Sequence, residues 1–242
     1  MQDPNHDPPT PGCIAAILPA AGSGKRFASD ENKLFAVLAD QPLWYHAASR
    51  LRQQSLVGRI VMAVNDADRG VFESRYADLI TQLDIELVLG GAQRTDSVRA
   101  GLETFADDES IRYVAVHDAA RPLVSQADLA AVFAVVTQSG AAILATPVPG
   151  TVKRSQSDGS IDRTVDRRDL WLALTPQVFR IDLLREAYAK YCGRPATDDA
   201  ELVERRGHAV TLVRGSADNI KITNPEDLLI AEAILKRQSE YA

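Results

Sequence analysis

The stretch Leu18-Pro-Ala-Ala-Gly-Ser-Gly-Lys-Arg-Phe27, with Lys33 six residues beyond it, decides how the rest of the chain is interpreted. It follows an apolar run, Cys13–Leu18, that predicts a buried strand. Small residues and glycines let a backbone pass close to a ligand, and successive free N–H groups form an anion-binding nest. Lys25, Arg26 and Lys33 add positive charge beside this nest. The stretch therefore predicts a nucleoside triphosphate loop at the first strand of an α/β domain.

Two better-known glycine loops do not match this stretch. The dinucleotide-binding pattern G-x-G-x-x-G needs a small third residue, where this chain has Phe27. The Walker pattern needs a glycine at the place of Pro19 and a serine or threonine at the place of Arg26. On the loop alone, a solvated turn with lysines nearby by chance stays open as the other interpretation, since short glycine motifs match freely.

The remaining sequence alternates short β-branched runs with longer amphipathic patterns. This alternation predicts an α/β fold with a doubly wound, mostly parallel sheet. Ligands of such sheets bind beyond the carboxyl ends of the strands, so the glycine loop and the His117-Asp118 turn should share one rim. Strands are expected over residues 14–18, 59–64, 85–89, 113–116, 142–147 and 210–214, and helices over residues 43–53, 67–80, 95–104, 127–137, 181–190, 200–204 and 225–236.

Length and composition limit the possible classes of protein. A chain of 242 residues can bury a substantial core as one domain, expected here from residue 13 to residue 242. The polar residues 1–12, which include four prolines, are expected to form a disordered tail. A net charge of −6 argues against nucleic acid as a partner, and no apolar run reaches membrane-spanning length. Two cysteines make no disulfide framework, which favours the cytoplasm.

One polar segment interrupts the strand–helix alternation. Asp158-Gly159 lies between two short strand-like runs, 151–155 and 160–164, and Asp-Gly in such a place predicts a β-hairpin. A two-stranded polar hairpin is only marginally stable by itself. The segment at about residues 148–168 is therefore either a loose surface ribbon or a protruding arm with a function of its own.

Six motifs follow one another along the chain and together are far more specific than any one of them. They are Pro19-Ala-Ala-Gly-Ser-Gly-Lys-Arg26 with Lys33, Gly90-Gly-Ala-Gln-Arg-Thr-Asp-Ser-Val98, Val116-His-Asp-Ala-Ala-Arg-Pro122, Thr164-Val-Asp-Arg167, Leu174-Thr-Pro-Gln177 and Asp218-Asn-Ile-Lys-Ile-Thr223. In this order, from about Ile14 to about Leu235, they resemble the 2-C-methyl-D-erythritol 4-phosphate cytidylyltransferase family of the non-mevalonate isoprenoid pathway. The resemblance implies a Rossmann-like nucleotidyltransferase fold, Mg²⁺ as cofactor, and a homodimer joined through the hairpin arm. It also implies transfer of CMP from CTP to methylerythritol phosphate.

The same resemblance implies roles for individual residues. Arg26 and Lys33 would stabilise charge on the reacting phosphates, and Arg167 and Lys221 would orient the attacking phosphate. A Mg²⁺ ion would approach Asp118, directly or through water. CTP would lie against Ala20, Ala21, Gly22, Gly24, Lys25, Gly91, Ser97, Asp118 and Ala119. The acceptor would be held by Arg121, Thr151, Arg167, Thr175 and Lys221, of which Thr151 and Arg167 would come from the neighbouring subunit's arm.

Several of these roles have alternatives that the sequence leaves open. Asp118 can serve Mg²⁺, the ribose, or the cap of a turn. Arg94 fits base recognition and bracing of its loop equally well. Ala92 stands where many relatives carry a polar residue, so main-chain groups are expected to read the base there. Gly150 and Asp199 also depart from the family pattern, at places expected to lie outside the chemical core.

Two rival functions are weighed against the first. Ribitol-5-phosphate cytidylyltransferases share the fold and the phosphate loop, but usually carry a bulkier residue at the place of Ala120. A catalytically silent nucleotide-binding module would not need Arg26, Lys33, Arg167 and Lys221 together. Because a phosphate nucleophile is already ionised near neutral pH, the reaction needs cations and positioning, with no side-chain base.

Overall fold

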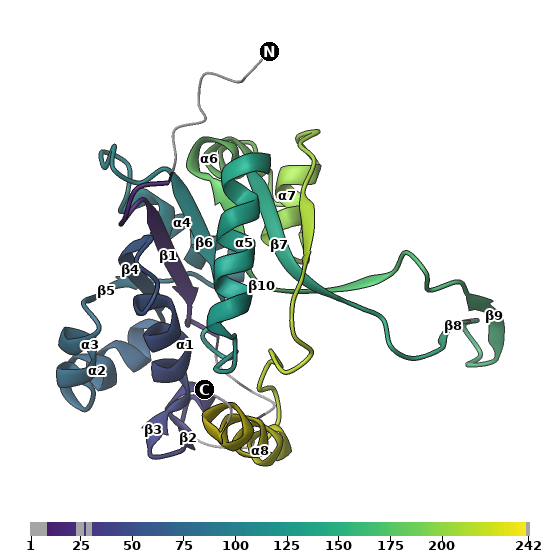
Figure 1. Ribbon diagram of the computed structural model, residues 1–242, viewed down its shortest axis with the longest axis horizontal. Helices are drawn as coiled ribbons and strands as arrows, with labels where there is room; N and C mark the ends of the chain where they lie inside the picture. The colour runs from purple at the N-terminus through teal and green to yellow at the C-terminus, as the bar shows by residue number, and fades with distance from the viewer. Residues whose placement is uncertain (1–8, 23–26, 28–30, 241–242) are drawn as a thin grey trace.

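A seven-stranded sheet organises the molecule, in the strand order β11-β7-β10-β6-β1-β4-β5 (Figure 1). The computed structural model describes residues 9–22, 27 and 31–240. Neighbouring strands run parallel except where β10 pairs with β6 and with β7, which confirms the mostly parallel sheet. The strands are β1 (Ile14–Pro19), β4 (Val57–Val64), β5 (Ile85–Leu89), β6 (Tyr113–Val116), β7 (Ala141–Pro147), β10 (Trp171–Arg180) and β11 (Thr211–Arg214).

Burial on both faces explains the continuous apolar run of β1. Each residue from Ile14 to Leu18 is completely buried, as is typical of parallel strands covered by helices on both sides. Ile14, Ala16 and Leu18 belong to one hydrophobic core, and Ala15 and Ile17 belong to the core on the opposite face. The alternation of side chains along a strand therefore divides the interior into two layers.

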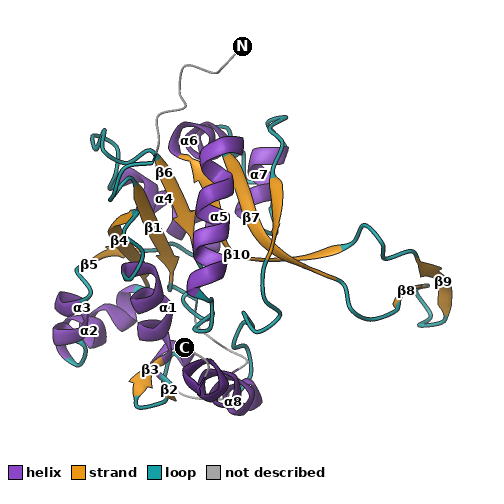
Figure 2. Ribbon diagram, in the orientation of Figure 1, coloured by secondary structure: helices purple, strands orange, loops and turns teal. Residues whose placement is uncertain are grey.

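Helices cover the two faces of the sheet separately (Figure 2). The first core contains side chains of α1 (Leu43–Arg52), α2 (Asp66–Ser74), α5 (Gln126–Ser139) and α8 (Glu226–Glu240). The second core contains side chains of α4 (Arg94–Glu103), α6 (Ile181–Ala189) and α7 (Asp199–Glu204). This arrangement confirms the doubly wound fold. The smaller elements are η2 (Lys33–Phe35), β2 (Val37–Leu38), β3 (Gln41–Pro42) and α3 (Ala77–Gln82).

The strand β10 is not expected from the sequence, although it lies in the middle of the sheet. Proline cannot donate to a strand ladder and argues against a central strand, and β10 contains Pro176. In the structure, the pairing of β10 with β7 shifts register between Ala173 and Gln177, so Pro176 falls in the irregular part. Pro176, which argues against a strand in the sequence, therefore occupies the stretch where the pairing of β10 with β7 is interrupted.

A single helix expected over residues 67–80 is wrong, because the segment forms two helices, α2 and α3. The break lies at Tyr76, whose backbone leaves the helical region with φ −117° and ψ 16°. Its ring packs at 5.5 Å from the ring of Phe35 and 5.8 Å from that of Trp44. We infer that this aromatic cluster fixes the bend, since such packing outweighs the modest preference for one continuous helix.

The segment between β7 and β10 forms a separate two-stranded sheet. Its strands, β8 (Val152–Ser155) and β9 (Ile161–Val165), pair antiparallel with Val152 opposite Val165. Figure 1 shows this pair standing away from the body of the molecule, at the end of two long chain segments that leave the main sheet. The main-chain pair at its root joins Pro147 of β7 to Trp171 of β10. The hairpin is therefore anchored in two neighbouring strands of the main sheet, neither of which lies at its edge.

Candidate active site

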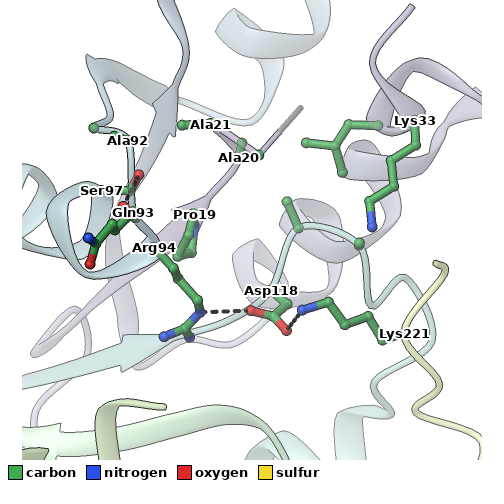
Figure 3. A pocket seen from close by; sticks show the side chains of 15 residues that line it. Pro19, Ala20, Ala21, Lys33, Ala92, Gln93, Arg94, Ser97, Asp118 and Lys221 are labelled. Atoms are coloured by element: carbon green, nitrogen blue, oxygen red, sulfur yellow. Dashed lines mark hydrogen bonds and ion pairs between the residues drawn. The ribbon is translucent and has the colours of Figure 1, made fainter. Parts of the chain in front are cut away.

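A cavity of about 220 Å³ lies beyond the carboxyl ends of β1 and β6, where the strand topology predicts a ligand. Loops that follow β1, β5 and β6, together with η2 and the segment before α8, contribute to it (Figure 3). The lining residues are Pro19, Ala20, Ala21, Gly22, Lys33, Leu34, Gly91, Ala92, Gln93, Arg94, Ser97, Asp118, Ala119, Ala120 and Lys221. The structure thus brings together nine residues predicted from the sequence: Ala20, Ala21, Gly22, Lys33, Gly91, Ser97, Asp118, Ala119 and Lys221.

Three predicted residues of the glycine loop, Gly24, Lys25 and Arg26, lie outside the described residues. The part of this loop that is described begins directly after β1, where the Ala20 amide donates to the Ala63 carbonyl at 2.8 Å. Ala20 is buried, and Ala21 and Gly22 continue along the edge of the cavity. Lys33, on η2, donates from Nζ to the Ile222 carbonyl at 2.8 Å and faces the cavity from the opposite side (Figure 3).

The loop before α4 approaches the glycine loop closely. A Cβ atom at Gly90 would lie 2.7 Å from Cβ of Ala21 and 2.6 Å from Oγ of Ser97, so a side chain at this position would force the loops apart. The α4 N-terminus is closed by a capping box in which Gln93 and Asp96 exchange side-chain and backbone hydrogen bonds. Ser97 is 2% exposed but still borders the cavity, with its Oγ 3.5 Å from the Gln93 carbonyl. Gly91, which has only backbone atoms, and Ser97 thus border the cavity at this end.

Asp118 lies at the centre of a group of cations. Its carboxylate accepts hydrogen bonds from Lys221 Nζ at 2.8 Å and from Arg94 Nε at 3.3 Å, and Arg121 Nε lies 3.6 Å away (Figure 3). Burial by itself would raise the pKa of Asp118, but the nearby charges of Arg94 and Lys221 outweigh it and hold the pKa well below its usual range. Asp118 stays ionised, and the group as a whole carries net positive charge, which suits a phosphate.

Arg94 adopts the bracing geometry of the two roles that the sequence leaves open. Besides Asp118, its guanidinium donates through Nη1 to Asp199 Oδ2 at 2.7 Å. Asp199 is fully buried and also accepts a hydrogen bond of 2.5 Å from the Tyr188 hydroxyl. Asp199 lines neither cavity, but Arg94 links its carboxylate to that of Asp118. The sequence gives no signal for this contact, which joins residues 105 positions apart.

A second cavity of about 270 Å³ adjoins the first. Both cavities are lined by Arg94, Asp118 and Lys221, so these residues form a wall common to the two. The remaining lining residues of the second cavity are Arg121, Ala173, Leu174, Thr175, Gln177, Thr197 and Asp198. Arg121 and Thr175, two of the acceptor contacts predicted from the sequence, therefore lie at this second cavity. Gln177, Thr197 and Asp198 also line it but are not among the predicted site residues. The motif from Leu174 to Gln177 carries the one usable signal, because it contains Gln177.

The Thr175 side chain makes hydrogen bonds within the protein in addition to the acceptor contact predicted for it. Its Oγ1 accepts from the Asp118 amide at 3.0 Å and lies 3.0 Å from Nδ1 of His117. Nε2 of His117 in turn lies 3.1 Å from the Arg121 carbonyl. His117 is completely buried, and this burial, partly offset by the charge of Asp118, lowers its pKa to about 4. The turn after β6 is thus fastened to β10 by a neutral histidine.

Two predicted acceptor residues do not reach either cavity within their own chain. Thr151 and Arg167 lie beside the β8–β9 hairpin, away from the body of the molecule (Figure 1). The Arg167 guanidinium donates to the carbonyl groups of Val148 and Pro149 at the base of the same hairpin. Both residues are exposed to solvent.

The donor groups fit a divalent ion that is held mainly by its ligand's phosphates. Among the described residues that line the first cavity, Asp118 is the single carboxylate, and its two oxygens already accept hydrogen bonds. No cluster of three or more histidine, cysteine, aspartate or glutamate side chains within the described ranges is arranged to hold a metal. Mg²⁺ binds through one or two carboxylates plus substrate phosphates and keeps several waters, which matches this donor set.

In the same described part of the chain, no helix is long and apolar enough to cross a membrane.

Comparisons with known proteins agree on one family. The family model described as 2-C-methyl-D-erythritol 4-phosphate cytidylyltransferase matches residues 14–237. A relative of that name from Rhodopirellula baltica is 52% identical over 94% of this chain and 97% of its own length, and one from Bacillus velezensis is 42% identical over 92% and 96%. The crystal structure of the Thermus thermophilus protein of the same name is similar with a TM-score of 0.74 and 33% identity, covering 92% of this chain and 98% of that one. A 4-diphosphocytidyl-2C-methyl-D-erythritol synthase structure from Anaerococcus prevotii has a TM-score of 0.78 at 29% identity, over 92% and 98% of the two chains.

Proposed function

The chain belongs to the 2-C-methyl-D-erythritol 4-phosphate cytidylyltransferase family, and from this premise we propose which of its residues perform each part of the reaction. The reaction, a step of isoprenoid biosynthesis, transfers CMP from CTP to the phosphate of 2-C-methyl-D-erythritol 4-phosphate. A bond forms between an acceptor phosphate oxygen and the α-phosphorus of CTP, and the bond from that phosphorus to the β-phosphate bridge breaks. The products are 4-diphosphocytidyl-2-C-methyl-D-erythritol and pyrophosphate.

One observation supports this assignment above the others: two adjoining cavities share a cationic wall made by Arg94, Asp118 and Lys221. We assign CTP to the first cavity, where the glycine loop and the loop before α4 offer backbone groups. The acceptor occupies the second cavity, beside Arg121 and Thr175. The two phosphates that must react then meet at the common wall.

Positive charge supplies the catalysis in this scheme. Lys33 faces the first cavity, and with Arg26 it stabilises the charge that grows on the α-phosphoryl group and on the departing pyrophosphate. Lys221, held by Asp118 at 2.8 Å, orients the attacking phosphate from the common wall. The nucleophile is already an anion, so this arrangement needs no side chain to remove a proton.

The acceptor site is completed by a second copy of the chain. Thr151 and Arg167 belong to the acceptor's predicted contacts, yet they lie on a hairpin that points away from the cavities of its own chain (Figure 1). A homodimer in which each hairpin, at about residues 148–168, reaches the partner's second cavity would bring these residues to the phosphate. The apolar side chains of Ile161 and Leu172, 63% and 49% exposed, would be covered by the same contact.

Mg²⁺ is the proposed cofactor. It would be held by the phosphates of CTP, with Asp118 as the protein group nearest to it through water, and when bound it neutralises charge on those phosphates.

The remaining assignments concern the chain as a whole. Residues 13–242 form one nucleotidyltransferase domain, which the two cores on a common sheet support, and the unpaired Cys13 and Cys192 support a reducing cytoplasm.

Release of pyrophosphate tests the function directly. The protein is mixed with CTP, Mg²⁺ and either methylerythritol phosphate or ribitol 5-phosphate, and pyrophosphate is followed with a coupled phosphate assay. We expect release with methylerythritol phosphate alone. Faster release with ribitol 5-phosphate would indicate that ribitol 5-phosphate is the acceptor. No release with either acceptor would favour a silent nucleotide-binding module.

A further inference from the structure

A buried carboxylate stands directly behind the wall common to the two cavities. Asp199 begins α7, is fully buried, and does not line either cavity. Both of its oxygens are used: Oδ2 accepts from Arg94 Nη1 at 2.7 Å, and Oδ1 accepts from the Tyr188 hydroxyl at 2.5 Å. A buried charge is tolerated only when it is paired and hydrogen-bonded, and these two contacts meet that need.

The carboxylate is not required to fasten α7 to the sheet. Oε1 of Gln177, on β10, accepts from the amides of Asp199 and Ala200 at 3.1 and 3.0 Å. Nε2 of Gln177 donates to Asp198 at 2.8 Å. Three hydrogen bonds therefore hold the start of α7 without the Asp199 side chain, which leaves its charge available for Arg94.

The contacts form one continuous chain that ends at Lys221, in the wall common to the two cavities. Tyr188 donates to Asp199, Asp199 accepts from Arg94, and Arg94 donates to Asp118 Oδ1. Asp118 Oδ2 then accepts from Lys221. Arg94 is planar, permanently charged and held at two edges of its guanidinium, so its orientation is set by the two carboxylates together.

We propose that Asp199, supported by Tyr188, is a positioning residue for cytidylyl transfer: it fixes Arg94, so that Asp118 keeps Lys221 at the boundary between the nucleotide and acceptor phosphates. The proposal rests on the proposed assignment of the two cavities. Without the Asp199 charge, Arg94 keeps a single carboxylate partner, turns toward Asp118, and competes with Lys221 for it. Lys221 then loses the position from which it aligns the attacking phosphate.

Asp199→Asn and Tyr188→Phe test the proposal, because each removes one contact and keeps nearly the same volume. For Asp199→Asn we expect kcat/KM for methylerythritol phosphate to fall about 10- to 100-fold, the usual range for loss of a charged buried hydrogen bond. CTP binding, measured by calorimetry without acceptor, should change far less, since the backbone groups assigned to CTP in the glycine loop and in the loop before α4 are left unaltered. Tyr188→Phe should lower kcat/KM about 3- to 10-fold. Asp199→Glu, which keeps the charge, should retain more activity than Asp199→Asn.

Two control variants match these changes elsewhere in the chain. Tyr113→Phe alters a tyrosine that is 3% exposed at the far end of β6, and Asp108→Asn breaks an ion pair with Arg59. Both should leave kcat/KM unchanged. Pyrophosphate release by the unaltered chain tests the proposed function, and the ratio of each variant to it tests this inference. Equal losses of CTP affinity and turnover in Asp199→Asn, or a Tyr188→Phe variant as active as Tyr113→Phe, would overturn it. If Asp199→Asn does not fold, Tyr188→Phe decides alone.

Discussion

Acid should destabilise this protein through one buried histidine, His117. The Arg121 carbonyl can only accept, so Nε2 of the ring carries the hydrogen and donates to it. Nδ1 of the neutral ring then accepts from the Thr175 hydroxyl, whose oxygen also accepts from the Asp118 amide. This pattern needs the neutral ring. A second proton, on Nδ1, would leave the Thr175 hydroxyl hydrogen without an acceptor in a fully buried place.

The size of the effect follows from the two pKa values. Burial lowers the pKa of His117 to about 4 in the folded chain, and an unfolded chain has the ordinary value of 6.5. Between these values the unfolded state binds a proton that the folded state does not, so stability falls as the pH falls. For a change from pH 7.5 to pH 5, the loss from this residue amounts to about 2 kcal/mol.

Urea unfolding at several pH values, at one fixed protein concentration, measures this loss. His117→Gln should be less stable than the unaltered chain at pH 7.5, yet its free energy of unfolding should fall about 2 kcal/mol less on going to pH 5. Phe105→Leu, a change at a fully buried side chain that carries no titratable group, is the control and should lower the free energy of unfolding by a similar amount at each pH. In NMR spectra the His117 ring signals should not titrate above pH 5. Titration near pH 6.5, or an identical pH slope in His117→Gln, would refute the reasoning.

Two further predictions concern the cations of the site. Lys33→Ala should lower kcat roughly 100- to 1,000-fold while changing the CTP dissociation constant much less, as for loss of a preorganised charge in a transition state. Near-normal turnover would remove Lys33 from the site, and Lys190→Ala, at the exposed C-cap of α6, is the control. Lys33→Ala and Arg167→Ala chains, each nearly inactive, should regain about a quarter of all active sites when unfolded and reassembled in equal amounts, because half of the dimers are mixed and each mixed dimer has one intact site. A reassembled mixture that is no more active than its parents, with subunit exchange verified, would mean that Arg167 does not act across subunits.

The strands that can be predicted from the sequence are those in which the segment's own side chains are enough to specify a strand. β1, β4 and β6 are short, β-branched or alanine-rich runs buried on both faces, and such runs are recognisable locally. β10 is different, because its place depends on partners far away in the sequence and its proline argues locally against it. The break between α2 and α3 depends likewise on Phe35 and Trp44, which lie outside the helical segment.

The same distinction applies to the site. Residues at strand ends, such as Asp118 and Ala20, are predictable because parallel strands deliver their loops to one rim. The pairing of Arg94 with Asp199 is not, since either could have met another charge of opposite sign. Division of the site into two cavities also depends on β10, which carries Thr175 and Gln177 to the second one.

The central place of β10 has a consequence for the order in which the chain can fold. Within the described sheet, β7 and β11 join β6, β1, β4 and β5 through β10 alone. The early strands β1, β4, β5 and β6 therefore cannot be joined to β7 until β10, at residues 171–180, is in place, and β11 adds to β7 later still. Contacts so distant in sequence are slow to form. On a ribosome the early strands emerge long before β10, so the acceptor cavity, which β10 lines, cannot form until β10 has joined them.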